Sequence, residues 1–201
     1  MSWSWSRSSK VFAMSLIGFA ASLAWAGKYN EVLDLGSEAP GWENLAGGDG
    51  KSHSLSDLQE SQLVVVVFTC NSCPVAQAYE QRLIEFAKDY RDRGAALVAI
   101  HVHRDESLAD ATEHARDKGF NFPYVHDAAQ EIARAYGATT TPHVFVLDKD
   151  RKVAYMGAVD DNMNAAEVEH HYLREAVDAL LKEEVPASPE TRQFGCGIKW
   201  Q

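Results

Sequence analysis

A run of apolar residues that leads directly into two closely spaced cysteines constrains the fold of this chain more than any other feature. The run Leu63-Val-Val-Val-Val-Phe68 is continuous and rich in β-branched residues, which is typical of a central strand buried on both faces. Cys70 and Cys73 follow it, and after Pro74 apolar residues recur at spacings of three and four. The sequence therefore predicts a buried strand, a short loop that carries a Cys-x-x-Cys pair, and a helix.

Strands and helices alternate along the rest of the chain. Paired capping residues predict helix starts at Asp127, with Gln130, and at Asn164, with Glu167. A strand–helix–strand unit followed by a hairpin and a closing helix predicts an α/β fold with a mixed central sheet flanked by helices, in which the first crossover is parallel. The further elements that we expect are a helix that ends before Gly94, strands over 95–102, 122–125, 144–147 and 153–157, and helices over 105–118, 127–137 and 165–182.

The first 26 residues have the features of a secretory signal peptide. Arg7 and Lys10 precede a mostly apolar stretch, which ends in Ala24-Trp25-Ala26, a small-x-small sequence that a signal peptidase accepts. We therefore expect an exported protein, periplasmic in a Gram-negative source. An uncleaved segment would instead tether the protein to the membrane.

Three expected regions follow from this pattern. Residues 1–26 form the signal peptide, residues 27–183 form one domain, and residues 184–201 form a tail that contains Cys196. Hydrophobic residues make up 46% of the chain and charged residues 24%, which is the composition of an ordinary globular protein. The net charge of −10 argues against nucleic acid as a partner, because binding to phosphates needs clustered Lys and Arg.

The cysteine pair is suited to thiol–disulfide exchange. Two sulfurs separated by two residues close a disulfide with little backbone movement, and the free N–H groups at a helix start favour a thiolate. We expect Cys70 at the helix N-terminus to attack and Cys73 to resolve the mixed disulfide. A zinc site would need two further ligands, and the sequence has no second Cys-x-x-Cys. A structural disulfide is the remaining alternative.

A second motif lies at Thr140-Thr141-Pro142-His143. Pro142 immediately precedes an expected strand, and proline is tolerated at the start of a strand because it has no N–H to donate to the ladder. In a cis conformation Pro142 would expose the backbone of Thr141 for pairing with an extended substrate chain. An ordinary proline at a strand start is the simpler interpretation.

These features together resemble the thioredoxin superfamily. The opening Leu35-Gly-Ser-Glu-Ala-Pro-Gly-Trp42 is similar to that of the redoxin branch, which includes TlpA-like oxidoreductases and peroxiredoxins, and the resemblance covers about residues 35–183. It implies a thioredoxin-like fold, with Cys70 as nucleophile, Cys73 as resolving thiol and Pro142 as a cis-proline. It also implies that the cysteine pair is the redox centre, with no organic cofactor and no metal.

The implied activity is exchange with protein thiols or disulfides, supplied by a membrane or periplasmic electron donor or acceptor. Some features depart from thioredoxin itself. Thr69 stands where thioredoxins usually have Trp, and Asn71-Ser72 separates the cysteines without the usual Pro. A thiol peroxidase that consumes small peroxides is the alternative, because peroxiredoxins carry a Thr shortly before a Cys-Pro; here Thr69 precedes Cys73-Pro74 at a spacing one residue too long.

Four further residues are candidates for accessory roles. Cys196 lies in the tail between two glycines and could reach Cys70 or Cys73 as an additional exchange partner. His101, His103 and His143 could form a copper site with the cysteines, as in copper metallochaperones on the same fold. Those proteins use a Cys-x-x-x-Cys spacing, which is absent here, so packed or surface histidines are the simpler interpretation.

Overall fold

The computed structural model describes Met1 and residues 27–201. The expected signal peptide, including the sequence at 24–26, lies outside the described residues. None of the helices in the described part of the chain has both the length and the apolar character needed to cross a membrane. The strands are β1 (Leu45–Ala46), β2 (Ser52–His53), β3 (Leu63–Thr69), β4 (Ala95–His101), β5 (Tyr124–His126), β6 (Thr140–Thr141), β7 (His143–Leu147), β8 (Val153–Gly157) and β9 (Cys196–Gly197).

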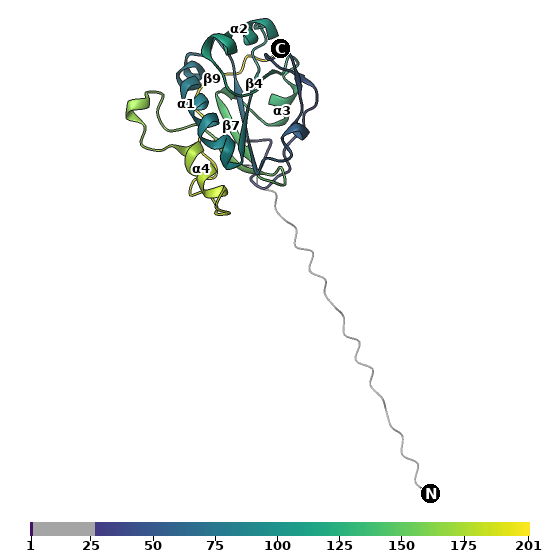
Figure 1. Cartoon of the computed structure of the whole chain (residues 1–201). Coiled ribbons are helices and arrows are strands. Elements are labelled where there is room, and N and C mark those ends of the chain that lie inside the picture. Colours follow the sequence, from purple (N-terminus) through teal and green to yellow (C-terminus); the bar gives the residue numbers. More distant parts are fainter. Residues whose placement is uncertain (2–26) are drawn as a thin grey trace.

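Four α-helices and three short 3-10 helices connect the strands of the described chain (Figure 1). The first α-helix ends in a 3-10 turn, and Gly94 closes that turn with a φ of 98°, a left-handed conformation that glycine adopts without strain. The helices are α1 (Pro74–Tyr90), α2 (Leu108–Lys118), α3 (Glu131–Ala135) and α4 (Tyr172–Leu180), and the 3-10 turns are η1 (Leu55–Leu58), η2 (Arg91–Arg93) and η3 (Ala165–Glu167).

A five-stranded mixed sheet forms the centre, in the order β5-β4-β3-β7-β8. β3, β4 and β5 run parallel, whereas β7 is antiparallel to β3 and β8 is antiparallel to β7. The expected mixed sheet, parallel first crossover and β7–β8 hairpin are therefore confirmed. β3 is the central strand, and all seven of its residues are buried, as its continuous β-branched sequence predicts.

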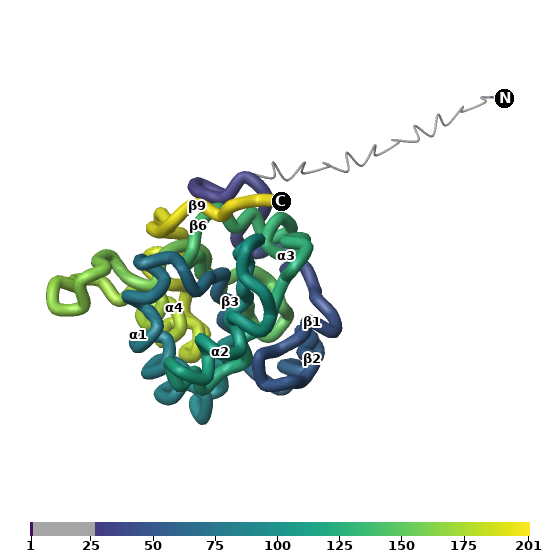
Figure 2. Tube along the Cα trace, turned by 90° about the horizontal axis from the view of Figure 1, so that it is seen from above, coloured from purple at the N-terminus to yellow at the C-terminus, as the bar shows by residue number. Residues whose placement is uncertain are grey.

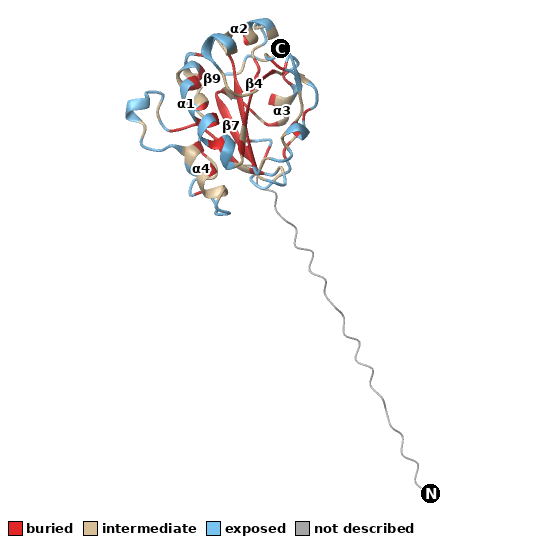
Figure 3. Cartoon of the chain, in the orientation of Figure 1, coloured by how far each residue is buried: buried red, intermediate tan, exposed pale blue. Residues whose placement is uncertain are grey.

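Alternate residues of β3 enter two separate hydrophobic cores. Val65 and Val67 pack with residues of α1, α2 and α4, whereas Val64, Val66 and Phe68 pack with α3 and with the lead-in segment that contains Trp42. In Figure 3 the buried residues concentrate on the central strands and on the inward sides of the helices. Because both faces of β3 are covered, its carboxyl end holds the following loop at a fixed position.

Two of the expected helices differ in the structure. α2 begins at Leu108 rather than Asp105, because Ser107 and Asp110 form a reciprocal capping box at that point. The single helix over 165–182 is wrong: only η3 and α4 are helical, and Val168 between them is extended. The Asn164 cap is nevertheless real, since its side chain accepts a hydrogen bond from the amide of Ala166.

The capping pair expected at Asp127 and Gln130 is also only half correct. The carboxylate of Asp127 accepts hydrogen bonds from the amides of Glu131 and Ala133, at 3.1 and 2.9 Å. Gln130 makes no capping bond, because its backbone is left-handed and its side-chain amide instead donates to the carbonyl of Val102. Gln130, which the pattern assigned to the cap of α3, therefore binds the backbone at the carboxyl end of β4 instead.

The C-terminal segment returns to the sheet rather than extending away from it. β9 pairs antiparallel with β6, with Thr140 opposite Gly197 and Thr141 opposite Cys196. Figure 2 shows the yellow β9 segment directly beside β6. The tail thus lies at the same end of the molecule as the loop that follows β3.

Candidate active site

The cysteine pair occupies the junction between β3 and α1. The helix begins at Pro74, and Cys73 is its N-cap, whose Sγ accepts a hydrogen bond of 3.3 Å from the amide of Ala76. The expectation that Cys70 lies at the helix N-terminus is therefore wrong. Cys70 lies in the loop before the helix, and the free amide of the first helical turn donates to Cys73 instead.

The two thiols influence each other, and their contacts shift the two pKa values in opposite directions. Both side chains are buried, with 6% of Cys70 and 3% of Cys73 exposed. The hydrogen bond from the Cys70 thiol, together with the amide of Ala76, lowers the pKa of Cys73 to about 4. The same shared bond, followed by burial, raises the pKa of Cys70. Cys73 is therefore the more acidic thiol of the pair.

Thr141 contacts both cysteines. Its Oγ1 lies 3.3 Å from Sγ of Cys70, and its carbonyl oxygen lies 3.1 Å from Sγ of Cys73. The peptide bond between Thr141 and Pro142 is cis, as the family resemblance implies. The hydroxyl can donate to a thiolate on Cys70, so it lowers the pKa of that thiol and offsets part of the increase that its neighbours cause.

Cys196 lies against the pair from the side of the tail. Its side chain is partly buried and packs in one cluster with Cys70, Cys73 and Ala76. Burial, followed by the contact with Cys73, raises the pKa of Cys196. All three cysteines are free thiols in the structure. The site therefore contains three neighbouring thiols.

Glu106, which the sequence reasoning did not identify, holds the loop between the cysteines. Its two carboxylate oxygens accept hydrogen bonds of 3.0 Å from the amides of Asn71 and Ser72. Although burial raises its pKa, the hydrogen bonds from the loop and from His101 prevail and lower that pKa to about 2. A charged carboxylate is thus fixed beside the redox pair. No local motif announces this role, because Glu106 lies between a strand and a helix in an ordinary polar stretch.

A pocket of about 140 Å³ opens at the three cysteines. His103 and Lys199 contribute polar side chains to its wall, while Val102 and Ile198 contribute apolar ones. The pocket is small, so it admits the side chain of a cysteine or a small molecule rather than a bulky cofactor.

The remaining candidate residues do not join the cluster of thiols. Thr69 is the buried last residue of β3, and its carbonyl accepts a hydrogen bond of 3.0 Å from the amide of Val102. The hydroxyl beside Cys70 belongs to Thr141 instead. His143 is 1% exposed and packs against Phe145, and burial lowers its pKa to about 4.

The histidines considered as copper ligands have other surroundings. His101 is fully buried and bound to Glu106, and His143 is packed in the core, so of the three only His103 lines the pocket. Within residues 27–201 and Met1, no group of three or more His, Cys, Asp or Glu side chains is arranged to hold a metal ion.

Comparisons with known proteins agree with this arrangement. A crystal structure of a hypothetical protein from Sinorhizobium meliloti 1021 superimposes with a TM-score of 0.79 and 34% identity, covering 84% of this chain and 96% of that chain. The thiol-disulfide oxidoreductase ResA of Bacillus thuringiensis (strain Al Hakam) is 27% identical over 125 residues, which is 61% of this chain and 69% of the relative.

A third comparison concerns the fold. A thiol:disulfide interchange protein of the thioredoxin family from Chlorobium tepidum TLS superimposes with a TM-score of 0.53 and 25% identity, covering 60% of this chain and 83% of that chain. The fold is therefore thioredoxin-like, as the sequence features predicted. The model of the Redoxin family matches residues 34–172, well over half of the chain. The buried strand β3, the cysteine pair and the helices α1, α2 and α3 lie within the matched segment. The chain belongs to the Redoxin family.

Proposed function

We propose that this protein is a thiol-disulfide oxidoreductase in which Cys70 and Cys73 form the redox pair. The observation that supports this most directly is the placement of both sulfurs at one pocket, at the end of a fully buried strand and at the cap of α1. Relatives named thiol-disulfide oxidoreductase support the same class of activity. The substrates are disulfides or thiols of proteins, which react without an organic cofactor.

In the reducing direction Cys70 attacks the substrate disulfide. Cys70 is the slightly more exposed residue of the pair, and Cys73, the more acidic thiol, accepts its proton. One substrate sulfur forms a mixed disulfide with Cys70, and the other leaves as a thiolate. That thiolate takes the proton from Cys73, which then attacks Cys70 and releases the second substrate sulfur. The products are a Cys70–Cys73 disulfide, one substrate thiol and one substrate thiolate.

Two serine variants test these roles. Cys73→Ser, mixed with a disulfide-bonded protein such as insulin, is expected to accumulate a mixed disulfide at Cys70, because the resolving sulfur is missing. Cys70→Ser is expected to lose more than about 99% of insulin reduction, since the attacking sulfur is absent. Full activity in Cys70→Ser would refute the proposal.

A peroxidase assay separates this activity from the peroxiredoxin-like alternative. Hydrogen peroxide consumption that survives Cys70→Ser and is lost in Cys73→Ser would assign the protein to peroxide chemistry at Cys73. We expect instead that peroxide is consumed at less than about one hundredth of the rate of disulfide exchange, because Thr69, the expected peroxidatic threonine, is not the hydroxyl placed at the cysteines.

The reduction potential determines the direction of exchange. Equilibration of the purified protein with glutathione buffers gives this potential. A value near about −270 mV identifies a reductant that depends on a donor, and a value near about −120 mV identifies an oxidant that transfers disulfides to other proteins.

We further propose that the protein acts outside the cytoplasm, on the basis of residues 1–26 alone. N-terminal sequencing of protein isolated from the source cells is expected to begin at Gly27. The matched variant Ala26→Asp should accumulate as the longer precursor, because a charged residue at that position blocks cleavage. A wild-type chain that retains its first 26 residues would contradict cleavage and favour a tethered form.

A further inference from the structure

The tail occupies the backbone edge that a substrate chain would need. Thr141, which contacts both cysteines, lies opposite Cys196 in the β6–β9 ladder, and the amide of Ile198 donates a 3.0 Å hydrogen bond to the carbonyl of Thr139. Extended chains commonly bind proteins by adding a strand to such an edge. Here the chain's own C-terminal segment is the added strand, and the residue that it presents to the redox pair is a cysteine.

Gly195 allows the tail to approach this closely. A Cβ atom at Gly195 would lie 2.2 Å from the carbonyl oxygen of Thr141, a distance that no real side chain tolerates. At Gly197, on the other side of Cys196, a Cβ atom would meet nothing within 4 Å. The two glycines that flank the cysteine therefore differ: only the first is required by the packing.

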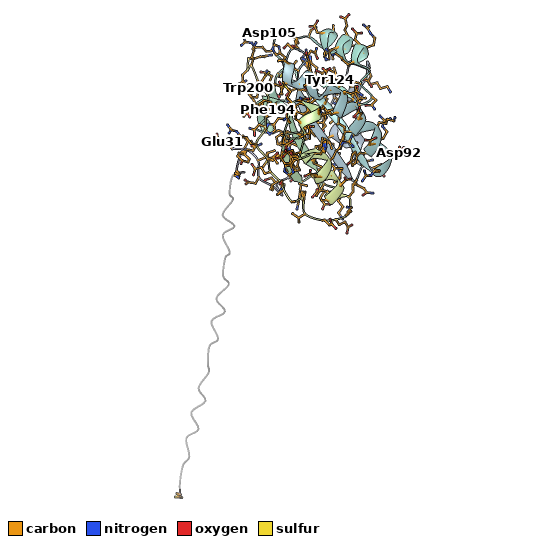
Figure 4. The ribbon with its side chains drawn as sticks, turned by 90° about the vertical axis from the view of Figure 1, so that its left-hand side faces the viewer. Glu31, Asp92, Asp105, Tyr124, Phe194 and Trp200 are labelled. Atoms are coloured by element: carbon orange, nitrogen blue, oxygen red, sulfur yellow. The ribbon has the colours of Figure 1, made fainter. Side chains whose placement is uncertain are left out.

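The residues beyond Cys196 fix the tail in place. The side chain of Gln130, which is fully buried, donates to the carbonyl of Lys199 and accepts from the amide of Gln201, both at 2.9 Å. The guanidinium of Arg134 lies 4.3 Å from the ring centroid of Trp200. Figure 4 shows Trp200 and Phe194, which lie on either side of Cys196, at the same side of the molecule as Asp105. The thiol is thus held from both directions.

The thiol of Cys196 lies next to the cysteines with which it would react, Cys70 and Cys73. Cys196 packs against the cluster of Cys70, Cys73 and Ala76 at the start of α1. It forms one wall of the pocket together with Cys70 and Cys73. A thiol that contacts one sulfur of a disulfide-forming pair, on a backbone that is held in register, is already positioned for exchange.

We propose that Cys196 is a third redox cysteine, which exchanges with Cys73 and makes the tail an internal acceptor of the disulfide. The proposal rests on the proposed function, because the Cys70–Cys73 disulfide is the product of exchange with a substrate. The thiolate of Cys196 attacks Sγ of Cys73, a Cys73–Cys196 disulfide forms, the Cys70–Cys73 bond breaks and Cys70 leaves as a thiolate. One disulfide is lost and one is gained, so no external oxidant is needed.

The exchange has two effects on the site. The disulfide now joins Cys73 to Cys196, and Cys70 is a free thiolate. The attacking sulfur is therefore available again before the protein meets its electron donor or acceptor. The new bond also ties the tail covalently to α1 and so keeps the edge of β6 covered. Because the tail pairs with β6 even when the cysteines are free thiols, a substrate chain can pair with Thr141 only after this bond is reduced and the tail is displaced.

The full-length Cys70→Ser variant tests the proposal directly. Incubated with oxidised glutathione, it should form a glutathione adduct at Cys73, which Cys196 then resolves to a monomeric Cys73–Cys196 disulfide. Mass spectrometry of the intact chain should show the loss of two hydrogens, and peptide mapping without reductant should identify the linked peptides. The double variant Cys70→Ser/Cys196→Ser should stop at the glutathione adduct.

A matched pair of glycine variants, made in the Cys70→Ser background, tests whether register controls the exchange. Gly195→Ala should slow release of glutathione from the adduct at least about tenfold, because its Cβ displaces the tail from Thr141. Gly197→Ala should change that rate less than about twofold, because its Cβ has free space. Circular dichroism at the same temperature checks that both variants are folded.

Three outcomes would overturn the proposal. They are a Cys70→Ser chain that retains its glutathione adduct, one that forms only intermolecular disulfides, and equal rates for the two glycine variants. None of these bears on the proposed function, which fails instead if Cys70→Ser reduces insulin as fast as the wild type. The two failures are therefore distinguishable.

Discussion

Glu106 Oε2 lies 2.6 Å from Nε2 of His101, whose ring is fully buried beneath the loop that carries the cysteines. The same carboxylate accepts hydrogen bonds from the amides of Asn71 and Ser72, in the loop between the cysteines. Because the pKa of Glu106 is about 2, it is charged at neutral pH. A fixed negative charge next to the redox pair disfavours the thiolate, so Glu106 should make the reduced form less stable.

Glu106→Gln is therefore expected to raise the reduction potential by about 30 mV, which corresponds to about 1.4 kcal/mol for a two-electron couple. Removal of the charge stabilises the thiolate. Equilibration with glutathione buffers measures the shift. Asp105→Asn is the matched control, since Asp105 is exposed and makes no bond to the loop. A potential that falls in Glu106→Gln, or that shifts equally in the control, would contradict this account.

Thr141→Val should raise the pKa of the Cys70 thiol by up to about one unit. The substitution keeps the shape of the side chain and removes the hydroxyl that lies 3.3 Å from Sγ of Cys70. The rate of alkylation of Cys70 by iodoacetamide as a function of pH, followed by peptide mapping, gives this pKa. Thr140→Val is the control, because the Thr140 hydroxyl donates to the carbonyl of Pro142 and not to a cysteine. An unchanged pKa in Thr141→Val would exclude the hydroxyl as a donor to Cys70.

His143 should make the fold sensitive to mild acid. Burial lowers its folded-state pKa from the ordinary 6.5 to about 4, so between these values the unfolded chain binds a proton that the folded chain excludes. The free energy of unfolding should therefore fall as pH falls from 6.5 to 4, by up to about 3 kcal/mol. Urea unfolding at several pH values measures the slope.

His143→Gln should make this slope smaller between pH 6.5 and 4, whatever its effect on stability at neutral pH. The part that remains comes from His101 and His126, because burial also lowers the pKa of each of these histidines. Glu106 contributes in a different window. Its pKa is lowered from 4.5 to about 2, so its stabilising contribution is present above pH 4.5 and is lost as the pH falls toward 2. A slope above pH 4.5 that is the same in His143→Gln and in the wild type would exclude His143 as a source of the acid sensitivity.

Arg82→Gln should destabilise the fold by about 3–5 kcal/mol, because it leaves Asp160 charged and unpaired. The side chain of Asp160 is 2% exposed, and Arg82 binds it together with the carbonyls of Asn162 and Met163. Arg93→Gln is the control: its pair with Asp178 is exposed to solvent and should contribute little to stability. Guanidinium unfolding compares the two, and equal losses would show that burial of the first pair is unimportant.

The central elements of the fold could be predicted because the short sequence of each element is enough to identify it as a strand or a helix. The run over 63–68 has no polar residue, so only a strand buried on both faces accommodates it, and Pro74 and Gly94 mark the start and end of α1 and its final 3-10 turn. The mixed sheet follows from the order of such elements. The cysteine pair was located for the same reason, since its chemistry is carried by two residues close in sequence.

The errors arise where distant contacts override local preference. The pattern over 165–182 suits one helix, but Arg82 on α1 binds the carbonyls that precede it, and the amide of Asp161 binds the carbonyl of His170. These contacts hold a loop between η3 and α4. In the same way Glu106 could not be assigned to the site, because its contacts with the loop leave no signal near either partner in the sequence. Cys196 was expected to reach Cys70 or Cys73, and it packs against both, but the pairing of its strand with Thr141 could not be predicted.

The binding of the last residues to Gln130 bears on how the protein is handled in the laboratory. The amide of Gln201 and the carbonyl of Lys199 are both held by that side chain, and Arg104 donates to the carbonyl of Trp200 at 3.0 Å. An affinity tag or fluorescent label fused after Gln201 would emerge beside the redox pocket and pull on the strand that carries Cys196. Tags are therefore better placed ahead of Gly27, and immobilisation through the carboxyl end is expected to change the very exchange kinetics that it is meant to measure.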